Sequence, residues 1–144
     1  IVGFGEAARI GQQCHSSSVS NLRDLLWNII SNECPDAKRN GSLQHSLPGT
    51  LNVTFTPADY LKLIPVFDDI ATSTGAACSI AKNALSHVLK SIGLTDQECG
   101  LTIRFGLSRL NTQEEALKAG TLIMFAIQDT PVTLSQLRLA ALSP

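Results

Sequence analysis

The sequence carries almost no excess of charge of either sign. Its 11 Lys and Arg residues nearly balance its 12 Asp and Glu residues, which leaves a formal net charge of −1. Nucleic acids and anionic membranes attract strongly basic surfaces, so we expect neither as a partner. No apolar run is long enough to cross a bilayer. The N-terminus also lacks the basic stretch and apolar core of a secretion signal.

Closely spaced metal ligands are lacking too. No two cysteines are two to four residues apart, and the three histidines complete no recognisable ligand spacing, so we expect no metal site. An even cysteine count permits disulfides. However, nothing indicates secretion, and 144 residues can form a core without them. We therefore predict free thiols in a reducing compartment, the cytoplasm or a eukaryotic mitochondrion, for Cys14, Cys34, Cys78 and Cys99.

The composition is that of a globular protein. Hydrophobic residues make up 44% of the chain and charged residues 16%, which excludes a disordered chain and is typical of a soluble domain. At 144 residues, one compact domain is expected. We find no internal repeat and no low-complexity segment.

The first part of the chain predicts two helices and a loop. Apolar residues over 1–14 indicate the end of a helix, which three serines at 16–18 should break. The next apolar residues follow the i, i+3, i+4, i+7, i+8 spacing of an amphipathic helix. Residues 34–49 are polar and contain two prolines and two glycines, so most of this segment should be loop. The helix-spaced residues are Leu22, Leu25, Leu26, Ile29 and Ile30.

The middle of the chain predicts two strands around a helix. Residues 50–55 alternate between apolar and polar, as in a half-buried strand. Pro57 suits the first turn of a helix, which Pro65 should end or kink. Residues 69–74 are β-branched enough for a second strand.

The last part predicts three helices and a third strand. Apolar residues from Leu85 to Ile92 share one helix face, and Gly93 can close that helix. Residues 95–98 form a capping box for a short helix. Residues 101–107 alternate as a strand, and residues 111–114 cap a last helix that runs to about Ile127.

Strands that alternate in polarity and are separated by helices favour a mixed or antiparallel sheet over a parallel one. We therefore predict an α+β domain. Its small antiparallel or mixed sheet should have three to four strands, with helices packed on one face.

Cys78 is a candidate nucleophile. It follows Gly75-Ala-Ala77, whose side chains are too small to bury it, and lies between a strand and a helix, where functional loops tend to lie. A reactive thiolate would need nearby positive charge or a base, which Lys82 or His87 could supply. The alternative is a small buried core residue, which is the commoner role of a free cysteine. On the residues alone, the buried-core interpretation is slightly favoured.

Arg104 is a candidate carboxylate-binding residue. Its neighbours Ile103 and Phe105 should face the core, so Arg104 should point from the opposite face of its strand. A planar guanidinium there suits bidentate binding of a carboxylate. An ordinary surface arginine is the alternative. Arg109, just beyond the strand, is expected to be structural or solvated.

Several segments together resemble the C-terminal region of NifS-like cysteine desulfurases and selenocysteine lyases, a class V aminotransferase family. They occur in the family's order and spacing and cover roughly residues 1–127. These segments are Asn40-Gly41, Leu47-Pro-Gly-Thr-Leu-Asn-Val-Thr-Phe55, Ser73-Thr-Gly-Ala-Ala-Cys-Ser79, Ser86-His-Val-Leu-Lys-Ser-Ile-Gly-Leu94, Thr102-Ile-Arg-Phe-Gly-Leu-Ser-Arg109 and Asn111-Thr-Gln-Glu-Glu115.

The resemblance implies a fold, an activity and two site residues. Residues 1–127 would be the C-terminal small domain of a fold type I pyridoxal phosphate (PLP) enzyme, beginning in a helix that joins it to a large domain. Residues 128–144 would be a tail. The enzyme would convert L-cysteine to L-alanine, or process selenocysteine. Cys78 would accept the sulfur as a persulfide for iron–sulfur cluster assembly, and Arg104 would bind the substrate α-carboxylate.

The sequence departs from the family pattern in places. Ala84-Leu85 replaces the usual Glu-Pro, Pro48-Gly49 replaces the usual Pro-Asn, and Pro65 is unusual within its helix. More importantly, the PLP-bearing lysine of the family follows a histidine in the large domain, and none of the lysines here follows a histidine. Without that lysine the chain lacks the electron sink of the reaction, so we expect it to bind no PLP and to be inactive alone.

The resemblance also implies partners. They are the N-terminal PLP domain, a second subunit in a homodimer of the full-length form, and a sulfur-acceptor or scaffold protein. The alternative function is a stand-alone, non-catalytic module that binds such acceptor or scaffold proteins. We further expect the small-residue loop around Cys78 to be mobile.

Overall fold

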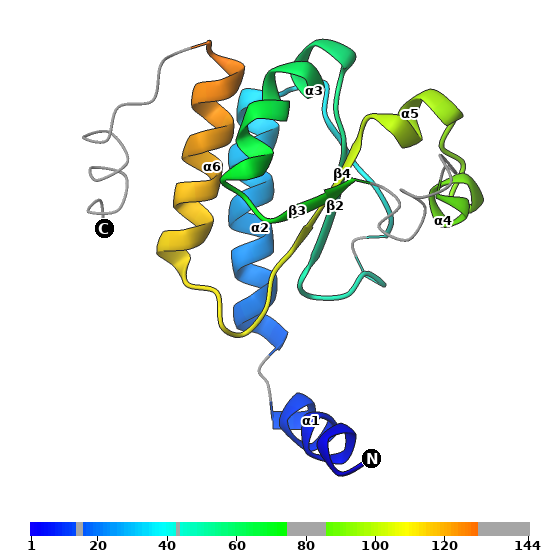
Figure 1. Cartoon of the computed structure of the whole chain (residues 1–144), viewed down its shortest axis with the longest axis vertical. Helices are drawn as coiled ribbons and strands as arrows, with labels where there is room; N and C mark the ends of the chain where they lie inside the picture. Colours follow the sequence, from blue (N-terminus) through cyan, green and yellow to red (C-terminus); the bar gives the residue numbers. More distant parts are fainter. Residues whose placement is uncertain (14–15, 43, 75–85, 130–144) are drawn as a thin grey trace.

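The computed structural model describes residues 1–13, 16–42, 44–74 and 86–129. Helices and short strands alternate along the chain (Figure 1). They are α1 (Val2–Gln13), α2 (Ser16–Glu33), β1 (Lys38–Arg39), β2 (Thr50–Thr54), α3 (Pro57–Leu63), the 3-10 helix η1 (Ile64–Asp68), β3 (Thr72–Thr74), α4 (His87–Ser91), α5 (Asp96–Gly100), β4 (Thr102–Gly106) and α6 (Gln113–Ile127).

The four strands form one antiparallel sheet in the order β1-β2-β4-β3. β4 is therefore an inner strand although it is last in the sequence. Its residue Arg104 lies opposite Asn52 of β2 and opposite Ser73 of β3. The edge strands are the short ones, with two and three residues, which limits the backbone left open to another chain.

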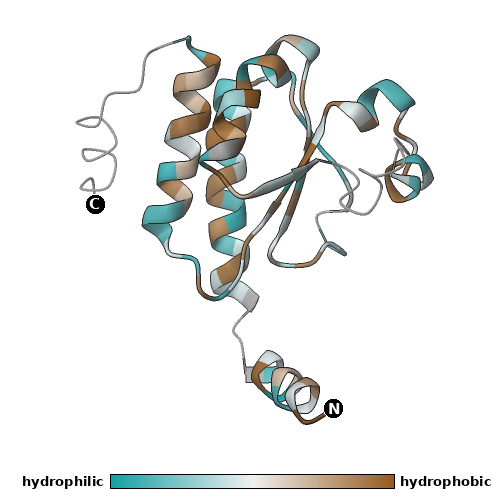
Figure 2. Cartoon of the chain, viewed as in Figure 1, coloured by the Kyte–Doolittle hydropathy of each residue, from teal (hydrophilic) through white to brown (hydrophobic). Residues whose placement is uncertain are grey.

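The long helices α2 and α6 pack together and cover one face of the sheet (Figure 1). Hydrophobic residues of both helices and of the strands meet between these layers (Figure 2). The α+β architecture with a small antiparallel sheet is thus confirmed. The buried core contains Leu26, Ile30, Cys34, Leu51, Val53, Phe55, Leu63, Ile103, Phe105 and Ile123.

The opposite face of the sheet is polar, and the short helices α4 and α5 lie on that side (Figure 1). The side chains of Thr54 and Thr102 are buried there, with Oγ1 atoms 2.8 Å apart. Thr102 also donates a 2.7 Å hydrogen bond to the backbone carbonyl of Glu98 in α5. These bonds attach α5 to the sheet.

The helix starts differ from the predicted ones in two places. Ser16–Ser18, which were predicted to break the first helix, form the first turn of α2, and α1 ends before them at Gln13. α6 begins one residue later than predicted, because Thr112 and Glu115 form its capping box. Asn111 instead accepts a 2.8 Å hydrogen bond from the backbone N–H of Ser108 and so stabilises the preceding turn.

The strands differ as well. β3 begins at Thr72 because η1, with Pro65 in its first turn, occupies the chain from Ile64 to Asp68. Pro65 thus ends the preceding helix, as predicted. The two-residue β1 lies within the segment predicted to be mostly loop.

A charge cluster fixes β1 against α2. Arg39 Nη1 donates to Asp24 Oδ1 at 3.1 Å, and the same carboxylate binds the buried Arg23 at 2.9 and 3.0 Å. These bonds, above all the one from Arg23, lower the pKa of Asp24 below its ordinary value. Hydrophobic periodicity does not reveal such a contact, which explains why the strand was missed.

α1 stands apart from the rest of the fold (Figure 1). From Val2 to Gln12, every residue except Ile10 is exposed, including the large side chain of Phe4. Among the described helices, none combines the length and hydrophobicity needed to cross a membrane.

The close packing of α2 and α6 depends on Gly120. A methyl group there would lie 2.5 Å from Ile29 Cδ1 and 3.0 Å from Ile29 Cγ2. Alanine favours a helix over glycine by about 1 kcal/mol, but overpacking costs about 1–3 kcal/mol. We therefore expect Gly120→Ala to lower the free energy of unfolding by about 1 kcal/mol in urea denaturation.

Two further variants test this cause. The double variant Gly120→Ala/Ile29→Val should recover part of the loss, since valine lacks Cδ1. Gly11→Ala in α1 is the matched control, because nothing lies within 4 Å of its added methyl. A Gly120→Ala protein as stable as the parent would refute the packing argument.

The core thiol of Cys34 gives a pH prediction. Burial, followed by the nearby charges of Asp59 and Glu33, raises the pKa of Cys34 from 9.0 to about 12. Above pH 9 the unfolded chain loses this proton while the folded chain keeps it, so stability should fall from pH 9 toward pH 12, by at most about 1.4 kcal/mol per pH unit. Urea denaturation of Cys34→Ala should show a shallower alkaline decline than the parent. Parallel curves would contradict the assignment.

Candidate functional site

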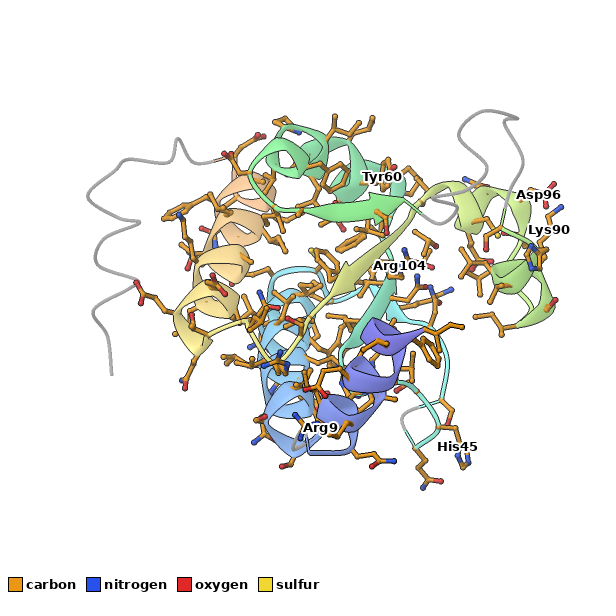
Figure 3. The ribbon with its side chains drawn as sticks, turned by 60° about the horizontal axis from the view of Figure 1, so that its bottom comes forward. Arg9, His45, Tyr60, Lys90, Asp96 and Arg104 are labelled. Atoms are coloured by element: carbon orange, nitrogen blue, oxygen red, sulfur yellow. The ribbon has the colours of Figure 1, made fainter. Side chains whose placement is uncertain are left out.

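Arg104 points to the polar side of the sheet, as the strand pattern predicted. Its neighbours Ile103 and Phe105 are 0% and 4% exposed, whereas Arg104 is exposed. Figure 3 shows Arg104 on β4. Within the described residues its guanidinium has no hydrogen-bond or ion-pair partner. The side chain is therefore a fixed-charge donor group that remains available to a ligand.

A row of polar residues crosses the sheet at the level of Arg104. Asn40, just after β1, donates its backbone N–H to the carbonyl of Asn52 at 2.8 Å. Asn52 pairs with Arg104, and Arg104 pairs with Ser73. Three strands and the residue that follows β1 thus contribute to one polar row: Asn40, Asn52, Arg104 and Ser73.

Arg104 lines a pocket of about 350 Å³ between α4 and this polar row. The α4 wall is apolar, and Arg104 is the only charged residue among the described residues of the lining. Such a combination suits a small organic anion, with the arginine meeting its charge and the apolar wall its hydrocarbon part. The lining residues are Asn40, Gly41, Thr50, Asn52, Ser86, Val88, Leu89, Ile92 and Arg104.

Local signals in the sequence hold α4 beside the sheet. Ser86 caps the helix by accepting the backbone N–H of Leu89, and the Leu89 side chain is 5% exposed. Gly93 follows with a φ of +96°, a conformation that glycine adopts without strain and that ends the helix as predicted. The apolar wall of the pocket is therefore built from short-range sequence features.

Cys78 and Lys82 lie outside the described residues, so the nucleophile and one of its suggested helpers stay predictions. The other helper, His87, is the exposed first residue of α4. The described residues on either side of this segment lie at the site. Thr74 ends β3 next to β4, and Ser86 lines the Arg104 pocket. The predicted mobility of the loop and the tail from residue 130 also fall outside the described residues.

Cys34 and Cys99 are free, as predicted, and both are buried, whereas Cys14 and Cys78 lie outside the described residues. Cys34 is 1% and Cys99 4% exposed. Because the thiolate is the reactive form, the raised pKa of Cys34 makes that thiol a poor nucleophile. These residues form part of the interior and offer no catalytic group.

PLP attachment requires a lysine amine. Among the described residues that line the Arg104 pocket, none is a lysine, and Lys82 lies outside the described part of the chain. Lys62 instead donates to the carbonyl of Ile127 at 2.7 Å, and Lys90 pairs with Asp96 at 2.8 Å (Figure 3). In the described part of the chain, no group of three or more His, Cys, Asp or Glu residues could hold a metal ion.

Other pockets in the described structure have a different chemistry. One of about 510 Å³, near α5, is lined by both signs of charge, from Asp36, Lys38 and Glu98. Another, of about 300 Å³, lies beside α6 and is lined by Asp69, Glu115 and Lys118 among others. Each contains carboxylates that would oppose an anionic ligand, which favours the Arg104 pocket for a carboxylate.

Asn40 and Asn52 were not predicted to be site residues. Strand alternation does place Asn52 on the face opposite the core. Alternation does not predict the register of β2 and β4, which sets Asn52 beside Arg104. That pairing joins residues 52 positions apart, and no local pattern encodes it.

No family model matches the chain. Among curated proteins, it is 39% identical over 118 residues to the cysteine desulfurase IscS of Serratia proteamaculans. It is 40% identical over the same length to the cysteine desulfurases IscS of Escherichia coli O139:H28 and Shigella boydii serotype 18. Each match covers 80% of this chain and 29% of the relative, within its C-terminal part. The chain is therefore a homologue of the C-terminal region of NifS-like cysteine desulfurases.

Proposed function

We propose that this chain is the C-terminal small domain of a PLP-dependent cysteine desulfurase or selenocysteine lyase, and that Arg104 binds the α-carboxylate of the amino-acid substrate. The observation that carries this is the exposed Arg104, which has no partner among the described residues and lies in a pocket whose described lining has no other charge. A guanidinium binds a carboxylate through two parallel N–H···O bonds, which fixes the orientation of the ligand as well as its position.

The second residue in the proposal is Cys78. Its thiol would take the sulfur from substrate cysteine: the carbon–sulfur bond of the substrate breaks, a sulfur–sulfur bond forms on Cys78, and alanine leaves. Atoms and electrons balance, because one thiol and one cysteine give one persulfide and one alanine. The positions of Thr74 and Ser86, on either side of the undescribed segment, support a place for Cys78 near the Arg104 pocket.

PLP would be held by a part of the protein beyond this chain, where it supplies the electron sink for breaking that bond. No lysine is among the described residues that line the Arg104 pocket, which supports this arrangement. The exposed apolar residues of α1, including Val2 and Phe4, support a role for this helix in joining the domain to that larger part. The same proposal includes a cytoplasmic location and a homodimeric full-length form.

A second candidate function is a module without catalysis, which docks sulfur-acceptor or scaffold proteins. The pocket without a lysine is compatible with it as well. The natural protein separates the two candidates. A native protein of 144 residues without PLP absorbance would support the module, and a longer yellow protein would support the enzyme.

Replacement of Arg104 tests the carboxylate role. The chain would be joined to the remaining part of the Escherichia coli cysteine desulfurase IscS, and alanine and sulfide release from cysteine measured. Loss of the charge-assisted contact in Arg104→Ala should lower kcat/KM by about 2–3 kcal/mol, or about 30- to 160-fold. Arg104→Lys should recover only part, since an ammonium is not bidentate.

Arg109→Ala serves as the control for Arg104, because Arg109 is exposed and does not line the pocket. It should leave kcat/KM within about twofold of the parent, as for an ordinary surface position. Equal losses in both variants would point to a general charge effect and contradict the proposal.

Replacement of Cys78 tests sulfur transfer in the same joined protein. Cys78→Ala should abolish turnover and also the persulfide, which can be detected as a mass increase on the parent after one turnover. Cys34→Ala is the thiol control and should retain the persulfide, because Cys34 is buried in the core. Unchanged turnover in Cys78→Ala would assign the residue to a packing role.

A further inference from the structure

A chain of hydrogen bonds leads from α5 to the Arg104 pocket. The Oγ1 atom of Thr102 lies 2.7 Å from the carbonyl oxygen of Glu98 and 2.8 Å from Thr54 Oγ1. Asn40 Nδ2 lies 2.8 Å from Thr54 Oγ1 and also 2.8 Å from Asn52 Oδ1. Four side chains are thus linked in series, and the last belongs to the strand neighbour of Arg104.

The carbonyl at one end fixes the direction of every bond in this chain. A carbonyl oxygen can only accept, so the single hydroxyl proton of Thr102 goes to Glu98. The proton between the two threonines must then come from Thr54. The Thr54 oxygen is left to accept from Asn40, whose facing group is therefore the NH₂ of its amide. A reversed direction would set two oxygens 2.7 Å apart without a proton between them.

The orientation of the Asn52 amide follows. Both amide protons of Asn40 are donated, one to Thr54 and one to Asn52, so the Asn52 atom facing Asn40 is the oxygen. Its NH₂ group is directed away from Asn40. Among the residues that the structure describes, this group has no hydrogen-bond partner, although Asn52 lines the pocket.

Asn52 and Arg104 are also close neighbours by register. The backbone bonds from Leu107 to Gly49 and from Phe55 to Leu101 mark the hydrogen-bonded pairs of β2 and β4. Hydrogen-bonded and non-hydrogen-bonded pairs alternate along an antiparallel ladder. Asn52 and Arg104 therefore form a non-hydrogen-bonded pair, in which facing side chains are closest. Their side chains can therefore reach one ligand group together.

We propose that Asn52 is a second carboxylate-binding residue, whose amide NH₂ donates to the same ligand carboxylate as Arg104 and is held in that orientation by the relay from Glu98 through Thr102, Thr54 and Asn40. This inference rests on the proposed role of Arg104. The amide adds a neutral hydrogen-bond donor beside the guanidinium. It therefore helps to orient the ligand carboxylate without adding a second charge. A neutral ligand amide would lose the charge of the carboxylate and fit poorly.

The test is a nitrogen-15 NMR titration of the 144-residue chain with acetate, at constant ionic strength, with acetamide as the uncharged probe. The Arg104 Nε–H and the Asn52 Nδ2–H₂ signals should shift with one common midpoint in acetate and should not saturate with acetamide. Asn52→Ala should weaken acetate binding at Arg104 about 2- to 10-fold, as for one lost hydrogen bond.

Two further variants separate donation from packing. Asn52→Asp keeps an oxygen for Asn40 but replaces the donor with charged oxygen, so it should weaken binding more than Asn52→Ala. Thr102→Val keeps the shape but removes the hydroxyl that sets the direction of the relay, and should weaken binding about twofold. Asn32→Ala, at an exposed position of α2, is the control and should not change the midpoint.

The outcomes distinguish this inference from the proposed function. If acetate shifts Arg104 with the same midpoint in the parent and in Asn52→Ala, the role of Asn52 is refuted and that of Arg104 stands. If acetate does not shift Arg104 at all, both fail. Arg104 and Asn52 signals that shift with different midpoints would mean separate binding events and would also overturn the shared site.

Discussion

The antiparallel pairing of β4 between β2 and β3 is the constraint on which the rest of the structure depends. Ile103 and Phe105 enter the core, so Arg104 between them must leave it. The same pairing brings Asn52 and Ser73 to either side of Arg104. One strand therefore anchors the domain and carries Arg104, the proposed binding residue, on a backbone that is held between two buried neighbours.

The stability of the polar face depends on the direction of its hydrogen bonds, from donor to acceptor, as well as on their number. The two threonine hydroxyls each donate to one particular acceptor, and the Asn40 amide donates to Thr54 and to Asn52, in an order that the carbonyl of Glu98 sets. Buried groups satisfied in this way stay in one arrangement, since any other leaves a donor or acceptor unpaired. The short helix α5 can thus influence the orientation of Asn52, the proposed ligand-binding amide.

The sequence predicted much of this fold because its signals are local. The alternation in β2 and β4, the break at Pro65 and the capping box after Thr95 each involve a few consecutive residues. β1 and the register of the sheet depend on contacts between distant residues, such as Arg39 with Asp24, and periodicity carries no information on them. For the same reason the face of Arg104 was predictable, whereas its neighbour Asn52 was not. The role of Cys78 stays a prediction from the resemblance alone.

The charge of Arg104, which has no partner among the described residues, links the stability of the domain to its solvent. A small anion that binds the folded pocket, and not the unfolded chain, stabilises the fold by RT ln(1 + [L]/Kd). Buffer anions such as acetate, phosphate or citrate would then act as ligands of the folded domain. The melting temperature of this domain would therefore depend on the anion in the buffer, and values measured in different buffers would differ for the same protein.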